Sequence, residues 1–251
     1  MSLGLPVYTS VGSGTLQTGT GTASLCAVSP NANTLAGDLV VVVCCAGPTT
    51  QAQEDVTVSR DNGDGWILLS SGYNSVTEPL GIFLAACIAT RNGSSGYAGI
   101  LFNASTYWYS AQSHTFRLAL PACFDLDHVG RDSGWAFNSA SDTALDAPAI
   151  NQPYQQVIDL VGRGYFNGGT TTTVANITNF TERFDTGSAA SYIGIALNDR
   201  TAAIIGAVQN PLITSALAVA KTYRMGVRAM IPIVGMQSPH RGRYGRYQVT
   251  F

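Results

Sequence analysis

Short runs of apolar and β-branched residues, separated by clusters of Gly, Asn, Asp and Pro, dominate the pattern along this chain. Runs of this length bounded by turn residues are typical of strands, and the 3.6-residue spacing of an amphipathic helix is almost absent. The pattern predicts strands at 39–45, 56–59, 66–70, 80–90, 98–102, 114–118, 155–162, 181–184, 191–198, 203–208, 215–220 and 223–231.

The run "LVVVVCCA" at 39–46 is apolar without alternation. Unbroken apolar runs of strand length are typical of strands that are covered on both faces. With 27 glycines and many "NG", "DG" and "GG" turns, the chain is predicted to be all-β. The architecture that we expect is a two-sheet antiparallel β-sandwich of jelly-roll type.

The chain also contains an internal echo. The first half reads "AGDLVVVVCCAG", then "DGWILLSSG", then "LGIFLAACIATR", and the second half reads "YQQVIDLVGRG", "NFTERFDTGS" and "SYIGIALNDRT". This order favours a sandwich built from two similar halves. We expect an N-terminal arm at 1–20, a sandwich at 21–234 with an irregular excursion at 123–148, and a C-terminal arm at 235–251.

Charge is scarce in the chain of 251 residues. Charged residues make up 11% and the formal net charge is −2, against roughly 25% charged residues in typical domains. Much of the surface is therefore expected to be uncharged or buried against neighbours. No basic region followed by an apolar run, and no apolar run of about 18 residues, is visible. We expect a protein that is made in a cytoplasm and has no contact with a membrane.

The stretch "DNGDG" raises the question of a metal. Counted from Asp61 as an EF-hand loop, the alternate positions are Gly63 and Gly65 and the twelfth residue is Gly72, so the required oxygen ligands are missing. Asn-Gly and Asp-Gly instead favour a hairpin turn that precedes the next strand. Asp61 and Asp64 are weak candidates for a nonstandard calcium site, and no cofactor is predicted.

The five cysteines show neither a CxxC motif nor zinc spacing with histidine. Cys44 and Cys45 are adjacent in a strand, so their side chains point to opposite faces. We expect the cysteines to be small buried hydrophobic residues. The sequence leaves open whether one disulfide forms after cell lysis.

Two segments are candidates for contacts with another subunit or a ligand. Tyr107, Trp108 and Tyr109 lie together in "STYWYS", where alternation puts the tryptophan on the opposite face from the tyrosines. A packed aromatic layer or subunit contact is favoured there over a sugar-stacking platform.

The second segment is the basic and aromatic tail "RGRYGRY". Its contact candidates are Arg241, Arg243, Tyr244, Arg246 and Tyr247. Interleaved arginine and tyrosine can bind nucleic acid, but the rest of the chain has no basic face. An arm that pairs with a neighbouring subunit is therefore favoured, and nucleic acid is not an expected partner.

The histidines do not predict catalysis. His114 is expected on a sheet surface, and His128 in "DLDHVGRD" is expected in a solvated, hydrogen-bonded loop. No GxSxG motif is present, and no pair of carboxylates stands out for glycoside hydrolysis. No catalytic residue is predicted.

In order, "AGDLVVVV", "DGWILLSSG", "FLAACIATR", "SHTFRL", "NFTERFDTGSAA" and "IGIALNDRTA" resemble a family of virion structural β-sandwich proteins of tailed phages and prophages. The resemblance covers roughly residues 20–232 and carries over no catalytic residue. It implies a component that decorates the head or belongs to the neck or tail. The excursion at 123–148 and the C-terminal extension depart from the family's pattern.

The sequence therefore predicts a non-enzymatic structural component of a tailed-phage virion, as a homo-oligomer in contact with major capsid, neck or tail subunits. The alternative is an adhesin on the virion surface that binds a host glycan. A polysaccharide hydrolase is the third interpretation.

Overall fold

The computed structural model describes residues 8–47, 56–60, 65–74, 80–95, 98–119, 122–131, 136–138, 143–144, 156–166, 176–187, 192–202, 212–213 and 224–235. In these ranges the chain forms strands and no helices, and every strand pair is antiparallel. The all-β prediction is thus confirmed. No helix in the described ranges has the length and apolarity needed to cross a bilayer.

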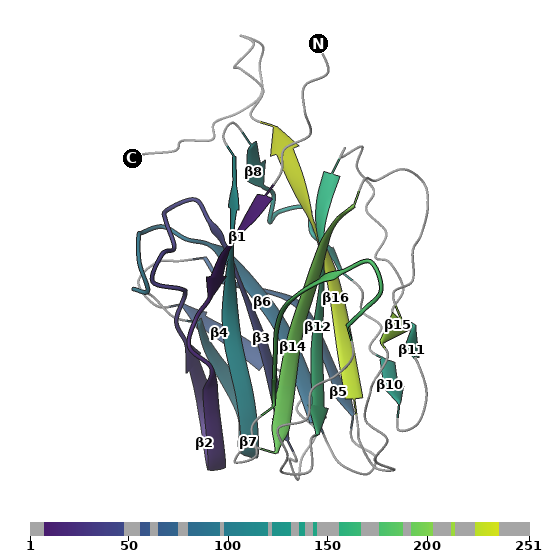
Figure 1. The fold of residues 1–251 in the computed structure, drawn as a ribbon. Coiled ribbons are helices and arrows are strands. Elements are labelled where there is room, and N and C mark those ends of the chain that lie inside the picture. Colours follow the sequence, from purple (N-terminus) through teal and green to yellow (C-terminus); the bar gives the residue numbers. More distant parts are fainter. Residues whose placement is uncertain are drawn as a thin grey trace.

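The first half of the chain forms one sheet, here sheet A. Its strands are β1 (Tyr8–Ser13), β2 (Gln17–Val28), β3 (Leu39–Gly47), β4 (Val56–Arg60), β5 (Ile67–Asn74), β6 (Leu80–Ile88) and β7 (Ala98–Leu118). The spatial order is β1-β7-β3-β6-β5, and β2 and β4 also pair with the long β7 (Figure 1).

The second half forms sheet B. Its strands are β8 (Ala122–Phe124), β9 (Gly130–Arg131), β10 (Ala136–Asn138), β12 (Gln156–Phe166), β13 (Thr181–Gly187), β14 (Ile193–Ala202) and β16 (Arg224–Gly235). The order is β10-β16-β12-β14-β13, with β8 and β9 paired to β16. Among the described residues, the short strands β11 (Thr143–Ala144) and β15 (Leu212–Ile213) form a separate two-stranded sheet.

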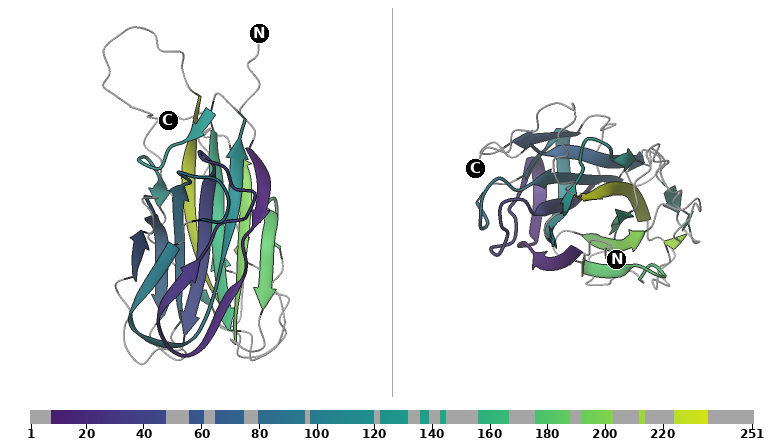
Figure 2. Two further views of the ribbon diagram at one scale, coloured as in Figure 1. Left: turned by 90° about the vertical axis from the view of Figure 1, so that its left-hand side faces the viewer. Right: turned by 90° about the horizontal axis from the view of Figure 1, so that it is seen from above.

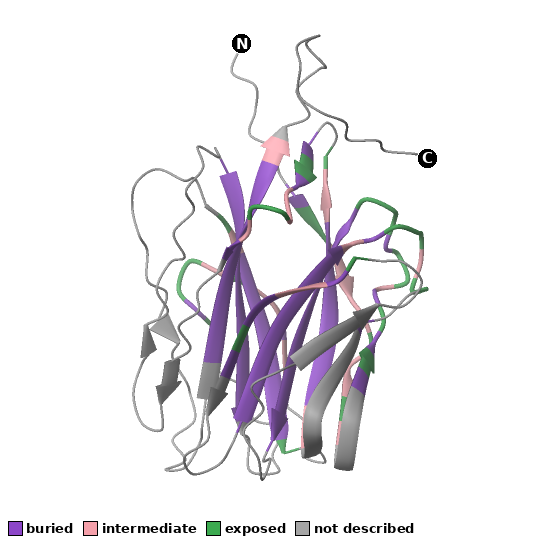
Figure 3. Cartoon of the chain, turned by 180° about the vertical axis from the view of Figure 1, so that it is seen from behind, coloured by how far each residue is buried: buried purple, intermediate pink, exposed green. Residues whose placement is uncertain are grey.

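The main core lies between the two sheets, which stack face to face (Figure 2). Alternate residues of β3 and β6, among them Val41, Val43 and Leu84, meet Leu160 and Leu197 of sheet B. Figure 3 shows the central strands of both sheets as buried.

A second core covers the other face of sheet A. Val40, Val42 and Cys44 of β3 pack there with Cys26 of β2 and Ala98 of β7. All nine residues of β3 are therefore buried, which confirms that the run "LVVVVCCA" is covered on both faces. The alternation also places Cys45 in the main core, opposite Cys44.

The echoing halves of the sequence occupy matching places in the two sheets. When β3, β5, β6 and β7 are matched with β12, β13, β14 and β16, sheet A reads β7-β3-β6-β5 and sheet B reads β16-β12-β14-β13. Both outer pairs contain a bulge at the same step, between Leu68 and Ser70 in β5 and between Glu182 and Phe184 in β13.

The jelly-roll connectivity is not confirmed. A jelly roll contains Greek keys, in which four consecutive strands take the spatial order 4-1-2-3. The four matched strands of each sheet take the order 4-1-3-2 instead.

Several strands differ from their predicted form. The predicted strands 98–102 and 114–118 are parts of one 21-residue strand, β7. The Gly- and Thr-rich β2 and the polar β1 were not predicted, and β1 lies inside the predicted N-terminal arm but pairs with β7. The turn predicted at "DNGDG" lies almost wholly outside the described residues; of the strands on either side, β4 pairs with β7 and β5 pairs with β6.

Candidate contact surfaces

Most of the residues predicted to form sites lie outside the described residues. This holds for Asp61 and Asp64, for the side chain of Tyr107, and for the tail residues Arg241, Arg243, Tyr244, Arg246 and Tyr247. Their roles stay predictions.

Trp108 and Tyr109 point to opposite faces of β7, as predicted. Tyr109 packs towards the second core, where its ring lies over Gly19 so closely that a Cβ on that glycine would be 2.1 Å from the ring. Trp108 packs at the margin of the main core and contacts the ring of Tyr192, at 4.9 Å between centroids and an interplanar angle of 41°. The described rings are therefore not a coplanar sugar platform; they form an inclined pair.

His114 is not on a sheet surface, contrary to the sequence prediction. Its side chain faces the main core side of β7 opposite Val41 and is buried. Its ring nitrogens contact the hydroxyls of Ser10 and Ser13, each at 2.9 Å. The polar residues of β1 provide these partners, which the alternation within β7 could not reveal.

The serine–histidine contact is a poor arrangement for nucleophilic catalysis. Burial, and then the guanidinium of Arg183, lower the pKa of His114 to about 4. A general base works best when its pKa is near the working pH, and the second nitrogen faces Ser13 where a triad would place a carboxylate. The contacts instead fasten β1 to β7.

His128 lies in an exposed loop and contacts Asp125 at 2.8 Å. Asp125 also accepts the backbone N–H of Asp127 at 3.0 Å, which is an Asx turn. The predicted hydrogen-bonded loop is thus observed. Within the described ranges no three metal-ligating side chains gather. Four cysteines are buried, whereas Cys123 is exposed.

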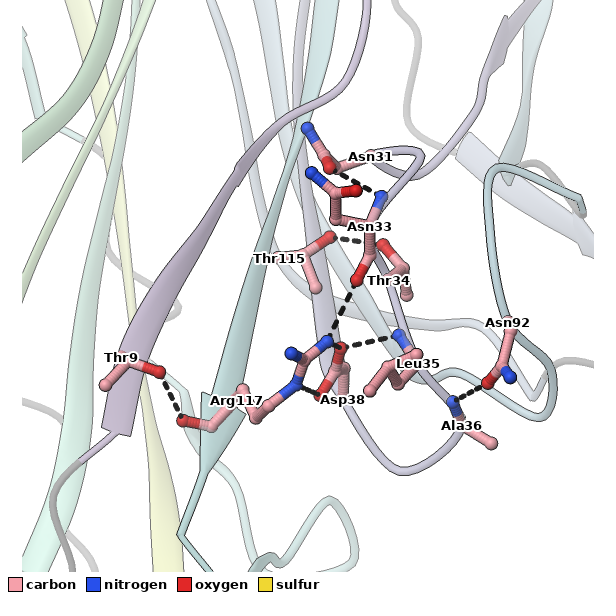
Figure 4. Close-up of polar contacts among 10 residues, drawn as sticks. All are labelled: Thr9, Asn31, Asn33, Thr34, Leu35, Ala36, Asp38, Asn92, Thr115 and Arg117. Carbon is pink, nitrogen blue, oxygen red and sulfur yellow. Dashed lines mark hydrogen bonds and ion pairs between the residues drawn. The ribbon is translucent and has the colours of Figure 1, made fainter.

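An exposed surface with many hydrogen bonds is formed by the β2–β3 connection at 29–38, with the β6–β7 connection at 89–95 beside it. We call it the Leu35 surface. Asp38 accepts the N–H of Leu35 at 2.7 Å and donates its own N–H to the Leu35 carbonyl at 3.1 Å. Arg117 of β7 binds both carboxylate oxygens of Asp38, at 2.8 and 2.7 Å (Figure 4). This fork fixes the turn on the end of the sheet.

Further bonds fix the rest of the Leu35 surface. Thr34 shares a 2.9 Å hydroxyl contact with Thr115, and Asn92 accepts the N–H of Ala36 at 2.9 Å (Figure 4). The N–H of Gly37, which has φ of 93°, donates to Ala89 at 2.8 Å. Leu35 stands at the centre of this frame with 43% of its surface exposed.

The outer face of sheet B is the least expected feature. Its alternation of apolar and charged residues is typical of a strand with a solvent face, yet Asp159, Arg163 and Arg228 are all at most 1% exposed. Ile177 packs on this face with Val161, and the ring of Phe180 lies 4.5 Å from the guanidinium carbon of Arg200.

Opposite charges pair across this face. Asp159 accepts two bonds from Arg228, at 2.7 and 2.6 Å, and one from Arg200 at 2.8 Å. Two same-face positions further along β12, Arg163 lies 3.4 Å from Glu182 of β13. Burial lowers the pKa of the Arg163 guanidinium. Bidentate arginine–carboxylate bonding partly offsets the cost of taking such charges out of water.

Tyr165 extends this face. Its hydroxyl donates to Asp185 at 2.6 Å, and burial and then this carboxylate raise its pKa. The positions of sheet A that match this face are apolar or small. The matched pairs are Val40 with Asp159, Cys44 with Arg163, Cys87 with Arg200 and Ser113 with Arg228.

A second ionic group joins the two sheets at their edge. Tyr8 of β1 donates to Asp199 of β14 at 2.5 Å, and Arg183 forms an ion pair with the same carboxylate. Arg183 occupies the bulge of β13, and a bulge redirects its extra residue. Burial and then the Asp199 charge raise the pKa of Tyr8. The group of Tyr8, Arg183 and Asp199 therefore fastens β1, the first described strand, to sheet B.

Sequence reasoning overlooked Leu35, Tyr192 and the buried charges of sheet B. The only signal for Leu35 was a lone large apolar residue inside the turn-forming stretch "NANTLAGD". No protein-family model, no curated protein and no solved structure matches the chain.

Proposed function

We propose that this protein is a non-enzymatic structural component of a tailed-phage virion, which decorates the capsid or forms part of the neck or tail. It acts by presenting a stiff β-sandwich-like body whose uncharged surfaces pack against neighbouring subunits. Its partners are further copies of itself and other virion proteins.

The observation that best supports this proposal is that many charged side chains pair with one another within the chain. Of 13 basic residues, five arginines pair with carboxylates of the same chain, namely Arg117, Arg163, Arg183, Arg200 and Arg228. Charged groups oppose burial at the centre of an interface, where they are depleted. A chain that pairs its charges internally can pack many copies side by side without strong repulsion.

The experiment is quantitative mass spectrometry of gradient-purified tailed-phage particles encoded by the genome that carries this gene. The measured quantity is the number of copies per copy of the major capsid protein. A near-stoichiometric ratio indicates capsid decoration, and one or a few rings per particle indicates the neck or tail. Absence from the particle would contradict the proposal.

A glycan-binding adhesin is the second candidate. The observation that favours it is the inclined Trp108–Tyr192 pair, in which Tyr192 is 38% exposed. Aromatic rings and flanking hydroxyls can bind sugars. Binding on an array of host-surface glycans that is lost in Tyr192→Asn, with the protein confined to the tail, would favour the adhesin.

A further inference from the structure

Two of the buried cysteines are in contact with each other. Cys26 of β2 and Cys44 of β3 both lie in the second core, and neither has any exposed surface. Their thiols are hydrogen bonded to one another. The two side chains therefore point towards the same spot from separate strands, which is the orientation that a disulfide requires.

The other three cysteines are not partners for Cys44. Cys45 projects into the main core from the opposite face of β3. Cys87 of β6 pairs with Val40, which precedes Cys44 by four residues, so its Cα atom is at least about 13 Å from that of Cys44 at roughly 3.3 Å per residue. The Cα atoms of a disulfide are separated by at most about 7 Å. Cys123 is exposed on β8 of sheet B.

The folded protein protects the pair from reaction. The half-buried ring of Tyr109 packs on the same core, and burial, and then charge on either sulfur, raise the pKa of its hydroxyl. Burial, and then the hydrogen bond to Cys26, raise the pKa of the Cys44 thiol. The thiolate is the form that attacks an oxidant. Oxidation of the pair is therefore slow and requires the packing around it to open.

We propose that Cys26 and Cys44 are a redox-sensitive pair, which forms one intrachain disulfide after the protein leaves a reducing cytoplasm. The oxidant is a small peroxide. One sulfur, as the thiolate, attacks a peroxide oxygen, the O–O bond breaks, and a sulfenic acid and one water form. The second sulfur then attacks the sulfenic sulfur, which completes the S–S bond and expels the second water. The two thiol protons end in the two waters, and two electrons pass from sulfur to the peroxide.

The bond closes a loop of about 18 residues that contains the whole β2–β3 connection. This loop includes the Leu35 surface, which Arg117 already fastens through Asp38. A cross-link restricts the unfolded chain and joins the two ends of the connection. The oxidised protein is therefore more stable than the reduced one, and its Leu35 surface opens less often. This inference goes beyond the proposed structural role and does not depend on it.

The test uses the full-length protein with Cys123→Ser, which removes the exposed thiol and leaves four of the five cysteines. After incubation with hydrogen peroxide over days, the protein is unfolded and alkylated without reductant. Mass spectrometry should count two alkylated thiols in place of four and find the peptides that contain Cys26 and Cys44 joined.

Stability gives an independent measurement on the same sample. The disulfide should raise the melting temperature by about 5–10 °C, because it closes a loop of this length in a chain of 251 residues. It should also slow amide hydrogen exchange at 29–38. Dithiothreitol, which reduces a disulfide but not an oxidised methionine, should reverse both effects once the protein has been unfolded and refolded.

Alanine variants identify the pair. Cys26→Ala should keep all its thiols after peroxide treatment, whereas Cys87→Ala, the matched control in the same core, should still lose two. If Cys26→Ala does not fold, the joined peptides and the comparison of oxidised with reduced protein decide the question. Retention of all four thiols in the Cys123→Ser protein, a bond between any other pair, or equal loss of thiols in Cys26→Ala would overturn the proposal.

Discussion

Replacing Asp159 by asparagine tests whether the buried charges of sheet B stabilise the fold. Asp159 is fully buried and accepts bonds from two arginines, of which Arg228 is also fully buried. Asparagine keeps the size of the side chain but removes its charge. Two guanidinium groups then lose their counter-charge, and Arg228 has no access to water.

The expected loss follows from the burial of Arg228. Removing one partner of a buried ion pair costs about 3–5 kcal/mol of unfolding free energy, because the remaining charge is uncompensated. Whole domains are stable by only about 5–15 kcal/mol, so Asp159→Asn should remove a large part of the total. Replacing the fully buried pair by apolar residues of similar volume, Asp159→Leu with Arg228→Met, should recover much of the loss, because the remaining Arg200 is 14% exposed and keeps access to water.

The assay is equilibrium unfolding in urea, with comparison of midpoints at an unchanged slope. The comparison is Asp38→Asn, which removes the charge opposite Arg117; the Asp38 side chain is 4% exposed, but the arginine left behind is 36% exposed. It should cost clearly less than Asp159→Asn, because the unpaired guanidinium keeps its access to water. A loss below about 1 kcal/mol for Asp159→Asn, or a double variant no more stable than the single one, would refute the reasoning.

Three further predictions follow from other buried contacts. Burial, and then a neighbouring guanidinium, lower the pKa of His114 from 6.5 to about 4. The imidazole therefore binds a proton more readily in the unfolded chain than in the folded protein. Stability attributable to His114 should be present above pH 6.5 and fall as the pH drops from 6.5 towards 4, by on the order of 2–3 kcal/mol, and His114→Gln should flatten this dependence in urea unfolding. Gly164→Ala should cost about 1–3 kcal/mol because its Cβ would lie 2.5 Å from a cysteine sulfur of β3, whereas Gly162→Ala, with its nearest atoms at 3.4 Å, should cost less, as thermal melts can show. Asp38→Asn should raise amide hydrogen exchange at 29–38 without changing exchange in β12, and equal exchange in both proteins would contradict the role assigned to the Asp38 fork.

Parts of the fold could be predicted because local pattern and burial agree. The run that forms β3 contains no polar side chain, so apolar side chains project from both faces of the strand and both faces favour burial. The echo of the two halves was visible because matched strands keep their turn residues and their order. Those features led to the all-β prediction and to bounds close to the observed ones for β3 and β6; the predicted strands 203–208 and 215–220 lie outside the described residues.

Other parts depend on contacts that no local pattern reports. In β12 the charged Asp159 and Arg163 alternate with the core residues Ile158 and Leu160, which is the pattern of a half-exposed strand, and only packing on the outer face makes the charged residues buried. β1 has one buried side chain, Tyr8, and depends on bonds to strands more than 100 residues away. The Leu35 surface is defined by side-chain bonds between separate connections, which spacing along the chain cannot show.

Electron cryo-microscopy of the purified particle tests the central claim most directly. The account predicts density for the two-sheet body in repeated copies. A particle map in which every protein density is assigned and none is this sandwich would contradict the account.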